Sequence, residues 1–161
     1  MILLLGLLMS LNGLAADPGR DEIAKVRVLV YHGTDGDPEV AGEKAEPVSE
    51  ETAKWLAAKE SLKFEHYRLL GSDSKPLFRS YENWAQPIGG SDEILCRFEV
   101  QSRLSKDSVR IDLELWLSRK KILKSGVVLK IGKPVVVLGP EWRGGRMIVS
   151  VELAPAPSKG Q

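Results

Sequence analysis

The feature that most constrains this chain is a run of strict alternation between apolar and other residues. From Ser108 to Ser118 almost every second residue is apolar, and Arg110, Asp112 and Glu114 stand between the apolar ones. Side chains of a β-strand point alternately to opposite faces, so the run predicts a strand with one apolar face and one face in water. A strand of a parallel sheet buried on both faces would instead read as a continuous apolar stretch. The alternation therefore predicts an antiparallel sheet.

Related patterns recur along the chain and define a set of expected strands. Strands are predicted over residues 23–31, 62–70, 93–102, 108–118, 122–131, 135–138 and 146–153. Short turns separate the later strands, so residues 93–153 are expected to form a meander within one layer that is wetted on one side. The predicted fold class is mainly β (α+β): an antiparallel sheet or sandwich of about six to seven strands with one covering helix.

The covering helix is predicted between Ser49 and Ser61. Serine is a favoured N-cap residue, and Glu50 and Glu51 place negative charge in the first turn, where it complements the helix dipole. Trp55 and Leu56 begin an apolar stripe with helical spacing, which is expected to pack on a sheet.

Two other stretches lack any periodicity. Residues 33–48 are rich in glycine, proline and acidic residues and are predicted to be a mobile loop. Residues 75–91 are aromatic but irregular. The tail 154–161 contains proline, serine and glycine and is expected to be disordered, so residues 17–153 are predicted to form a single β-rich domain.

The N-terminus has the layout of a secretory signal peptide. Residues 1–16 carry no charged side chain; their short apolar run is broken at Asn12 and Gly13 and followed by the small residues Ala15 and Ala16. No lysine or arginine precedes the run, so only the amino terminus supplies positive charge. A run of this length is too short to anchor the mature chain in a membrane. The predicted location is therefore periplasmic or secreted.

The single cysteine, Cys96, bears on both export and packing. A bacterial lipoprotein needs a cysteine directly after its signal peptide, and Asp17 occupies that place here, so no N-terminal lipid anchor is expected. One cysteine cannot form an internal disulfide. Cys96 shares a strand face with Phe98 and Val100, which predicts a small buried hydrophobic residue rather than a reactive thiol.

Total charge argues against nucleic acid as the main partner. Lysine and arginine number 23 and aspartate and glutamate 22, a net charge of +1. Phosphate binding usually needs a clustered basic surface, and the near balance instead predicts an ordinary mixed-charge surface.

No motif points to a metal, a cofactor or a catalytic centre. The only histidines, His32 and His66, stand apart with no metal-ligand spacing, and no G-x-S-x-G sequence is present. The acids near Asp35 are interpreted as a solvated turn rather than a calcium loop. Asp112 and Glu114 share a strand face but are interpreted as surface residues. A hydrolase that uses His66 with a nearby acid stays a less favoured alternative.

Aromatic residues supply the candidate site. Tyr81, Trp84 and Trp142 lie in predicted loops and are the candidates for binding a ligand or partner. In the competing interpretation Trp84 and Trp142 fold over open sheet edges as plugs. Trp116 would then pack beneath the helix or beneath residues 75–91.

Two stretches of sequence carry a resemblance to known proteins. The stretches GVVLKIGKPVVVLGPEWRGGRMIVSVEL, at 126–153, and FEHYRLLGSDSKPL, at 64–77, resemble those of small exported bacterial β-rich proteins of unassigned chemistry. More distantly, LKIGKPVVVLGP is similar to a turn near the end of outer-membrane secretins, although Gly139 is followed here by Pro140 where secretins tend to have a second glycine. The resemblance implies a role in the cell envelope.

These observations favour a non-catalytic exported binding module whose partner is another envelope protein. A carbohydrate- or small-ligand-binding domain is the alternative. Function resides in sites rather than folds, so the sequence leaves the ligand and the oligomeric state open.

Overall fold

A computed structural model describes residues 22–78, 83–87 and 93–156 of the chain. In these residues nine strands, one α-helix and two short 3₁₀ helices follow one another. The strands are β1 (Glu22–Thr34), β2 (Glu46–Pro47), β3 (His66–Phe78), β4 (Asn83–Pro87), β5 (Ile94–Ser105), β6 (Ser108–Leu117), β7 (Lys120–Lys130), β8 (Val135–Trp142) and β9 (Gly145–Pro155). The helices are η2 (Pro38–Ala41), α1 (Glu50–Ala57) and η3 (Glu60–Leu62).

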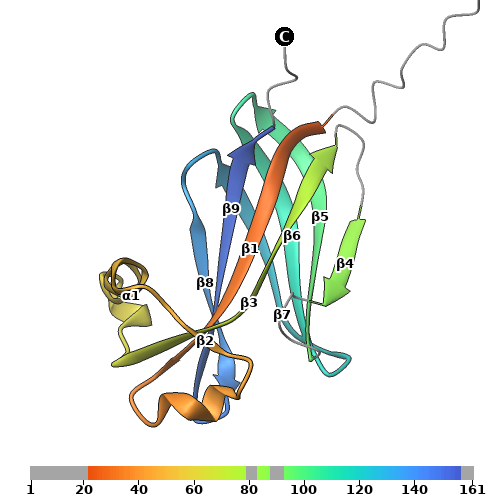
Figure 1. The fold of residues 1–161 in the computed structure, drawn as a ribbon. Coiled ribbons are helices and arrows are strands. Elements are labelled where there is room, and N and C mark those ends of the chain that lie inside the picture. Colours follow the sequence, from red (N-terminus) through yellow and green to blue (C-terminus); the bar gives the residue numbers. More distant parts are fainter. Residues whose placement is uncertain (1–21, 79–82, 88–92, 157–161) are drawn as a thin grey trace, which may run out of the picture.

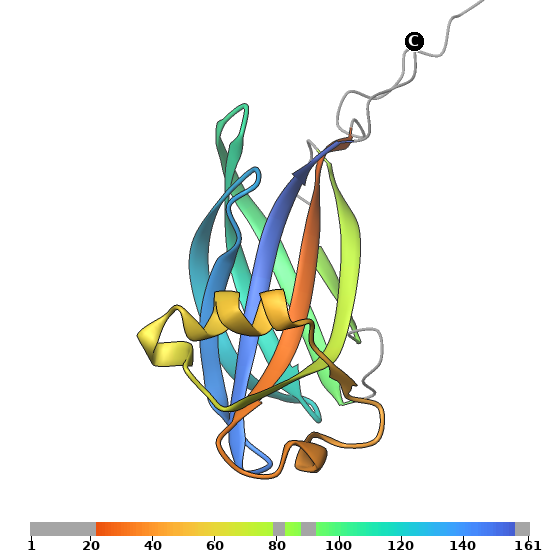
Figure 2. The same ribbon diagram turned by 60° about the vertical axis from the view of Figure 1, so that its left-hand side comes forward.

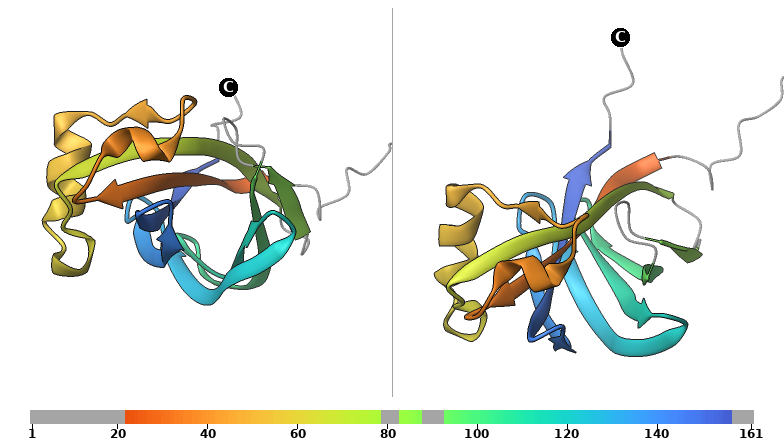
Figure 3. Two further views of the ribbon diagram at one scale, coloured as in Figure 1. Left: turned by 90° about the horizontal axis from the view of Figure 1, so that it is seen from below. Right: turned by 60° about the horizontal axis from the view of Figure 1, so that its bottom comes forward.

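The strands form two antiparallel sheets that pack as a sandwich, which confirms the predicted fold class. One sheet has the order β2-β3-β1-β9-β8 and the other the order β4-β5-β6-β7. Figure 1 and the view from below in Figure 3 show the two layers facing each other. The main core between them consists of inward side chains from both sheets, among them Val28, Val149, Ile111 and Leu113, all at most 1% exposed.

The expectation of one layer over residues 93–153 is wrong. Strands β5, β6 and β7 form a meander as predicted, but β8 and β9 belong to the other sheet. The chain changes layers after β7, in a bend where Gly132 has a φ of 69° and Pro134 follows. The hydrophobic period is the same in both layers, so alternation alone could not reveal this change of sheet.

Strand β3 is longer than the predicted segment 62–70. It continues through Gly71 and Asp73 to Phe78, because β1 pairs with it along nearly its whole length. Val30 pairs with Gly71 and Val28 with Asp73, so residues typical of a turn are held in a strand by their partner. The segment predicted to be irregular, 75–91, thus contains the end of β3 and all of β4.

The predicted helix is present but shorter than expected. Ser49 is its N-cap, and the Ser49 hydroxyl oxygen accepts a hydrogen bond from the backbone N–H of Thr52 at 3.2 Å. The α-helix ends at Ala57, and η3 (Glu60–Leu62) follows after two residues that belong to neither helix.

Helix α1 covers the outer face of the five-stranded sheet (Figure 2). A second apolar cluster lies beneath it, with Leu56 and Ile148 fully buried. The remaining buried members of this cluster are Tyr31, Leu62 and Tyr67.

The structure also tests the expectations for Cys96 and for residues 33–48. Cys96 is fully buried in the main core, as predicted, and burial raises the pKa of its thiol to about 12. The segment 33–48, predicted to be a mobile loop, contains η2 and β2, and Glu39 in it forms an ion pair with Arg68 of β3. Among the described residues no helix is long and apolar enough to cross a membrane.

Candidate functional site

The structure describes two of the three aromatic residues that were predicted to bind a ligand or partner. Tyr81 lies outside the described residues. Trp84 lies in strand β4 rather than in a loop, and its backbone pairs with Phe98. Trp142 ends β8 at the hairpin to β9. A shared recognition surface of these three residues therefore stays a prediction.

Trp142 has structural contacts on several sides. Its half-buried side chain packs against the main core, and its ring meets that of His32 edge-on, with centroids 5.6 Å apart. The Arg143 guanidinium lies 4.5 Å from the Trp142 ring centroid. The backbone carbonyl of Trp142 accepts a hydrogen bond from His32 Nε2 at 3.0 Å. Trp142 ends β8, an edge strand of the five-stranded sheet. The competing interpretation, in which Trp142 folds over an open sheet edge as a plug, stays a prediction beside the binding role.

His32 is completely buried at this end of the molecule. Its Nδ1 atom has no partner among the described residues, and burial lowers the pKa of the imidazole below its usual 6.5. Gly145 packs directly on the ring: a Cβ at that position would lie 2.4 Å from His32 Nε2. His66, in contrast, is exposed at the start of β3 and pairs with Thr34.

An open cleft lies beside this end, with a volume of about 390 Å³. Its polar walls come from the end of β1 and from the β8–β9 hairpin. The lining includes Asp35, Phe64, Glu141 and Arg146. Arg146 is fixed in place because its guanidinium donates two hydrogen bonds to the backbone carbonyl of Gly139, at 2.8 and 3.1 Å.

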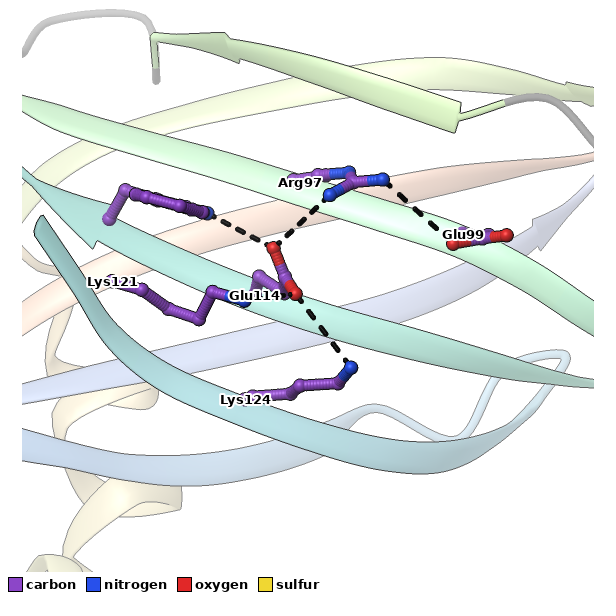
Figure 4. Close-up of polar contacts among 6 residues, drawn as sticks. Arg97, Glu99, Glu114, Lys121 and Lys124 are labelled. Carbon is purple, nitrogen blue, oxygen red and sulfur yellow. Dashed lines mark hydrogen bonds and ion pairs between the residues drawn. The ribbon is translucent and has the colours of Figure 1, made fainter. Parts of the chain in front are cut away.

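The strongest concentration of charge lies elsewhere, on the outer face of β5, β6 and β7. Antiparallel pairing places Arg97 opposite Glu114, and Glu114 opposite Lys124. Figure 4 shows Arg97, Lys121 and Lys124 gathered around the carboxylate of Glu114. Each strand thus contributes one or more side chains to a single charged cluster.

Glu114 is held by four neighbours. Its Oε1 accepts a hydrogen bond from Lys121 Nζ at 2.7 Å, and its Oε2 accepts one from Trp116 Nε1 at 3.2 Å. Arg97 and Lys124 add ion pairs at 3.5 and 3.9 Å. The hydrogen bond from Lys121 is the main cause that lowers the pKa of Glu114 below its usual 4.5.

This geometry corrects two interpretations of the sequence. Glu114 points away from the main core but is only 6% exposed, because the side chains around it cover its carboxylate. Of the two places expected for Trp116, the one beneath the helix is wrong because α1 covers the other sheet, and the one beneath residues 75–91 stays a prediction. The Trp116 indole donates a hydrogen bond to Glu114, and Lys121 Nζ lies 5.1 Å from the ring centroid.

Accessible cations outnumber accessible acids around Glu114, although 44% of the Glu99 side chain is exposed. Residues 94–130 hold nine lysines and arginines and four acids. Eight of the nine basic residues are exposed, and Arg97 is half-buried; of the acids, only Asp107 is exposed. We call the outer surface of β5–β7 around Arg97, Arg110, Lys121 and Lys124 the basic face.

The opposite imbalance occurs in residues 33–65, which we call the acidic lobe. The acidic lobe contains nine aspartates and glutamates, all exposed, and four lysines. The total charge of +1 hides this separation: each segment mixes both signs, as predicted, but in opposite proportions. A count of charge by segment, rather than over the whole chain, is the sequence signal that would have found it.

Neither a metal-binding group nor a known relative accompanies these surfaces in the described part of the chain. No group of three or more histidine, cysteine, aspartate or glutamate residues suited to a metal ion occurs in the described part of the chain. No protein-family model, curated protein or solved structure matches this chain.

Proposed function

We propose that this chain is a non-catalytic binding module of the cell envelope that docks on an acidic protein surface through its basic face. The supporting observation is that the face exposes more cations than acids, so a partner meets net positive charge. Glu114 fixes Lys121 and Arg97 in position from beneath. Cations held in place lose less side-chain entropy on binding than free ones do.

The pattern on the face favours a protein over nucleic acid. Glu99 and Asp112 are half-buried between the cations and lie opposite each other on β5 and β6. A continuous phosphate backbone would pass close to these carboxylates and be repelled. A protein surface that carries acids with some interspersed donors suits such a face better.

Binding to poly-L-glutamate tests the basic face directly. The wild-type protein is expected to bind this probe at low salt, and R110E/K124E is expected to bind roughly tenfold more weakly because two cations become anions. The matched control is K54E/K63E, which makes the same change in net charge on exposed lysines of the acidic lobe.

The outcomes separate the proposal from its rivals. An equal loss of affinity in K54E/K63E would show that only net charge matters and would overturn a specific face. Preference for duplex DNA or for vesicles of anionic lipid over poly-L-glutamate would also overturn it. Retained poly-L-glutamate affinity in R110E/K124E would locate the binding surface elsewhere.

The envelope location is supported by the apolar run of residues 1–16 and needs its own test. We expect protein recovered from the periplasmic fraction or the medium to begin at Asp17 when its N-terminus is sequenced. Recovery of the chain only in the cytoplasm with Met1 or Ile2 at its start would contradict this part of the proposal.

The cleft supports a second candidate function, binding of a small polyhydroxylated ligand such as a sugar. An aromatic ring, two carboxylates and a fixed guanidinium line it, a combination that suits stacking and hydrogen bonding to hydroxyl groups. Trp142, next to the lining residue Glu141, is expected to report binding through its fluorescence. A flat response to a glycan panel, or a response unchanged in F64A, would remove this candidate.

A further inference from the structure

The basic face and the acidic lobe lie on opposite sides of the molecule. Helix α1 and the segments around it cover the outer side of the five-stranded sheet, whereas β5, β6 and β7 form the other layer (Figures 1 and 2). The two-layer core separates them, as the view from below shows (Figure 3). The two surfaces therefore cannot neutralise each other within one molecule.

The chain segments that contain the two surfaces are also matched in charge. Residues 94–130 carry a net charge of +5 and residues 33–65 a net charge of −5, with histidines absent from both. Because almost all of the charged residues that make up these imbalances are exposed, each surface presents its charge to a partner. Opposite potentials of similar size steer two proteins together and fix their relative orientation.

We propose that the acidic surface bound by the basic face is the acidic lobe of a second copy of this chain. This inference rests on the proposed function and names its partner. The contact joins two different surfaces, so it is a heterologous, head-to-tail contact. Each bound copy still offers one free basic face and one free acidic lobe, and the assembly grows with protein concentration unless a rotation closes it into a ring.

Exposed charged side chains allow the charge of each surface to be changed separately, at two positions. R110E/K124E reverses two cations of the basic face and leaves Lys121, the hydrogen-bond donor to Glu114, in place. E43K/E46K reverses two exposed acids of the lobe. R110Q/K124Q removes the same cations without adding acids, and serves if the reversal disturbs folding.

Analytical ultracentrifugation of the mature chain is the first measurement. We expect the weight-average mass to rise with concentration in about 20 mM salt, and the apparent association constant to fall by roughly tenfold or more in about 300 mM salt. Each reversed variant alone is expected to stay monomeric, although its melting curve shows it to be folded.

Mixing the two variants gives the decisive result. R110E/K124E keeps a normal acidic lobe and E43K/E46K keeps a normal basic face, so one native contact forms between them. At the outer ends remain a basic segment reduced from +5 to +1 and an acidic lobe reduced from −5 to −1. These two altered surfaces could also attract each other. The neutral variant R110Q/K124Q, which adds no acids, therefore identifies the native contact. When R110Q/K124Q is mixed with E43K/E46K, we expect 1:1 dimers that do not grow further.

The possible failures are distinguishable. A wild-type protein that stays monomeric at low salt but binds poly-L-glutamate through Arg110 and Lys124 overturns the second copy as partner and leaves the proposed function standing. Absence of both activities overturns both. Self-association that neither reversal alters would place the contact on another surface and overturn the inference.

Discussion

The outer faces of the two sheets have the same pleated geometry and opposite surroundings. On the five-stranded sheet, outward positions hold Leu29, Tyr31 and Ile148, and α1 with its neighbours covers them. On the four-stranded sheet, outward positions hold Arg97 and Lys124, which remain accessible to solvent. The face with apolar outward side chains is covered by α1, and the face with charged outward side chains is left in solvent. The difference therefore comes from the side chains and not from the geometry of the sheets.

The difference also separates stability from recognition. Burial of apolar area stabilises the helix-covered face, at roughly 25 cal/mol per Å². Exposed ion pairs add little, so the basic face contributes little to folding and is free to meet a partner. The following predictions test this division of roles, from the largest expected effect to the smallest.

Substitution of Leu56 by alanine should have the largest effect. Leu56, in α1, is fully buried against the sheet, and its truncation leaves a cavity there. We expect a cost of about 2–5 kcal/mol in the free energy of unfolding, measured by urea denaturation. V128A on the other sheet, where the side chain is 38% exposed, is the control and should cost less than about 0.5 kcal/mol. Equal losses of stability in L56A and V128A would contradict the assignment of stability to the helix-covered face.

Acidification should weaken the five-stranded sheet first. The folded protein resists protonation of His32, because burial lowers its pKa, whereas the unfolded chain takes up the proton near pH 6.5. Stability is therefore expected to decline as pH falls below about 6.5, by at most roughly 1.4 kcal/mol per pH unit from this one group. H32Q should show a smaller slope in pH-dependent thermal melts. An identical slope in H32Q would exclude His32 as the cause.

The charged cluster should respond at lower pH. The lowered pKa of Glu114 means that its stabilising contribution is present above about pH 4.5 and is lost as pH falls through the pKa of the folded state. We expect E114Q to cost about 1 kcal/mol near pH 7, since Lys121 loses its charged partner. That difference from wild type should shrink below pH 4.5. A difference that is constant with pH would contradict an ionic role.

Removal of one exposed cation should have the smallest effect on folding. Lys124 has 58% of its side chain exposed and lies 3.9 Å from the nearest oxygen of Glu114. K124A is expected to change the free energy of unfolding by no more than about 0.5 kcal/mol while it weakens binding to poly-L-glutamate. Loss of stability without loss of binding would reverse the roles assigned to the two faces.

The sequence was informative where local pattern and fold agree. The alternation around Ile111 and Leu113 correctly predicted an antiparallel sheet, and the position of Cys96 correctly predicted burial. The cap at Ser49 correctly marked the start of the helix. Each of these features depends on neighbours a few residues apart.

The remaining features depend on partners distant in sequence. Gly71 and Asp73 continue a strand only because β1 lies beside them. Glu114 is buried because Arg97 and Lys121 come from two other strands, and no spacing within β6 reveals them. The opposing charges of the two segments can be counted in the sequence, but their placement on opposite sides of the molecule depends on the packing of the two sheets.

The position of β1 determines when this domain can fold during its synthesis. β1 lies in the interior of its sheet, between β3 and β9, and pairs along its length with the last strand of the described chain. A nascent chain that lacks β9 leaves one side of β1 without its hydrogen-bond partners and the core open. Pairing between such distant segments is slow because a long loop must close first. The polypeptide therefore completes its sheet only after β9 has been synthesised, and until then its core stays open to solvent.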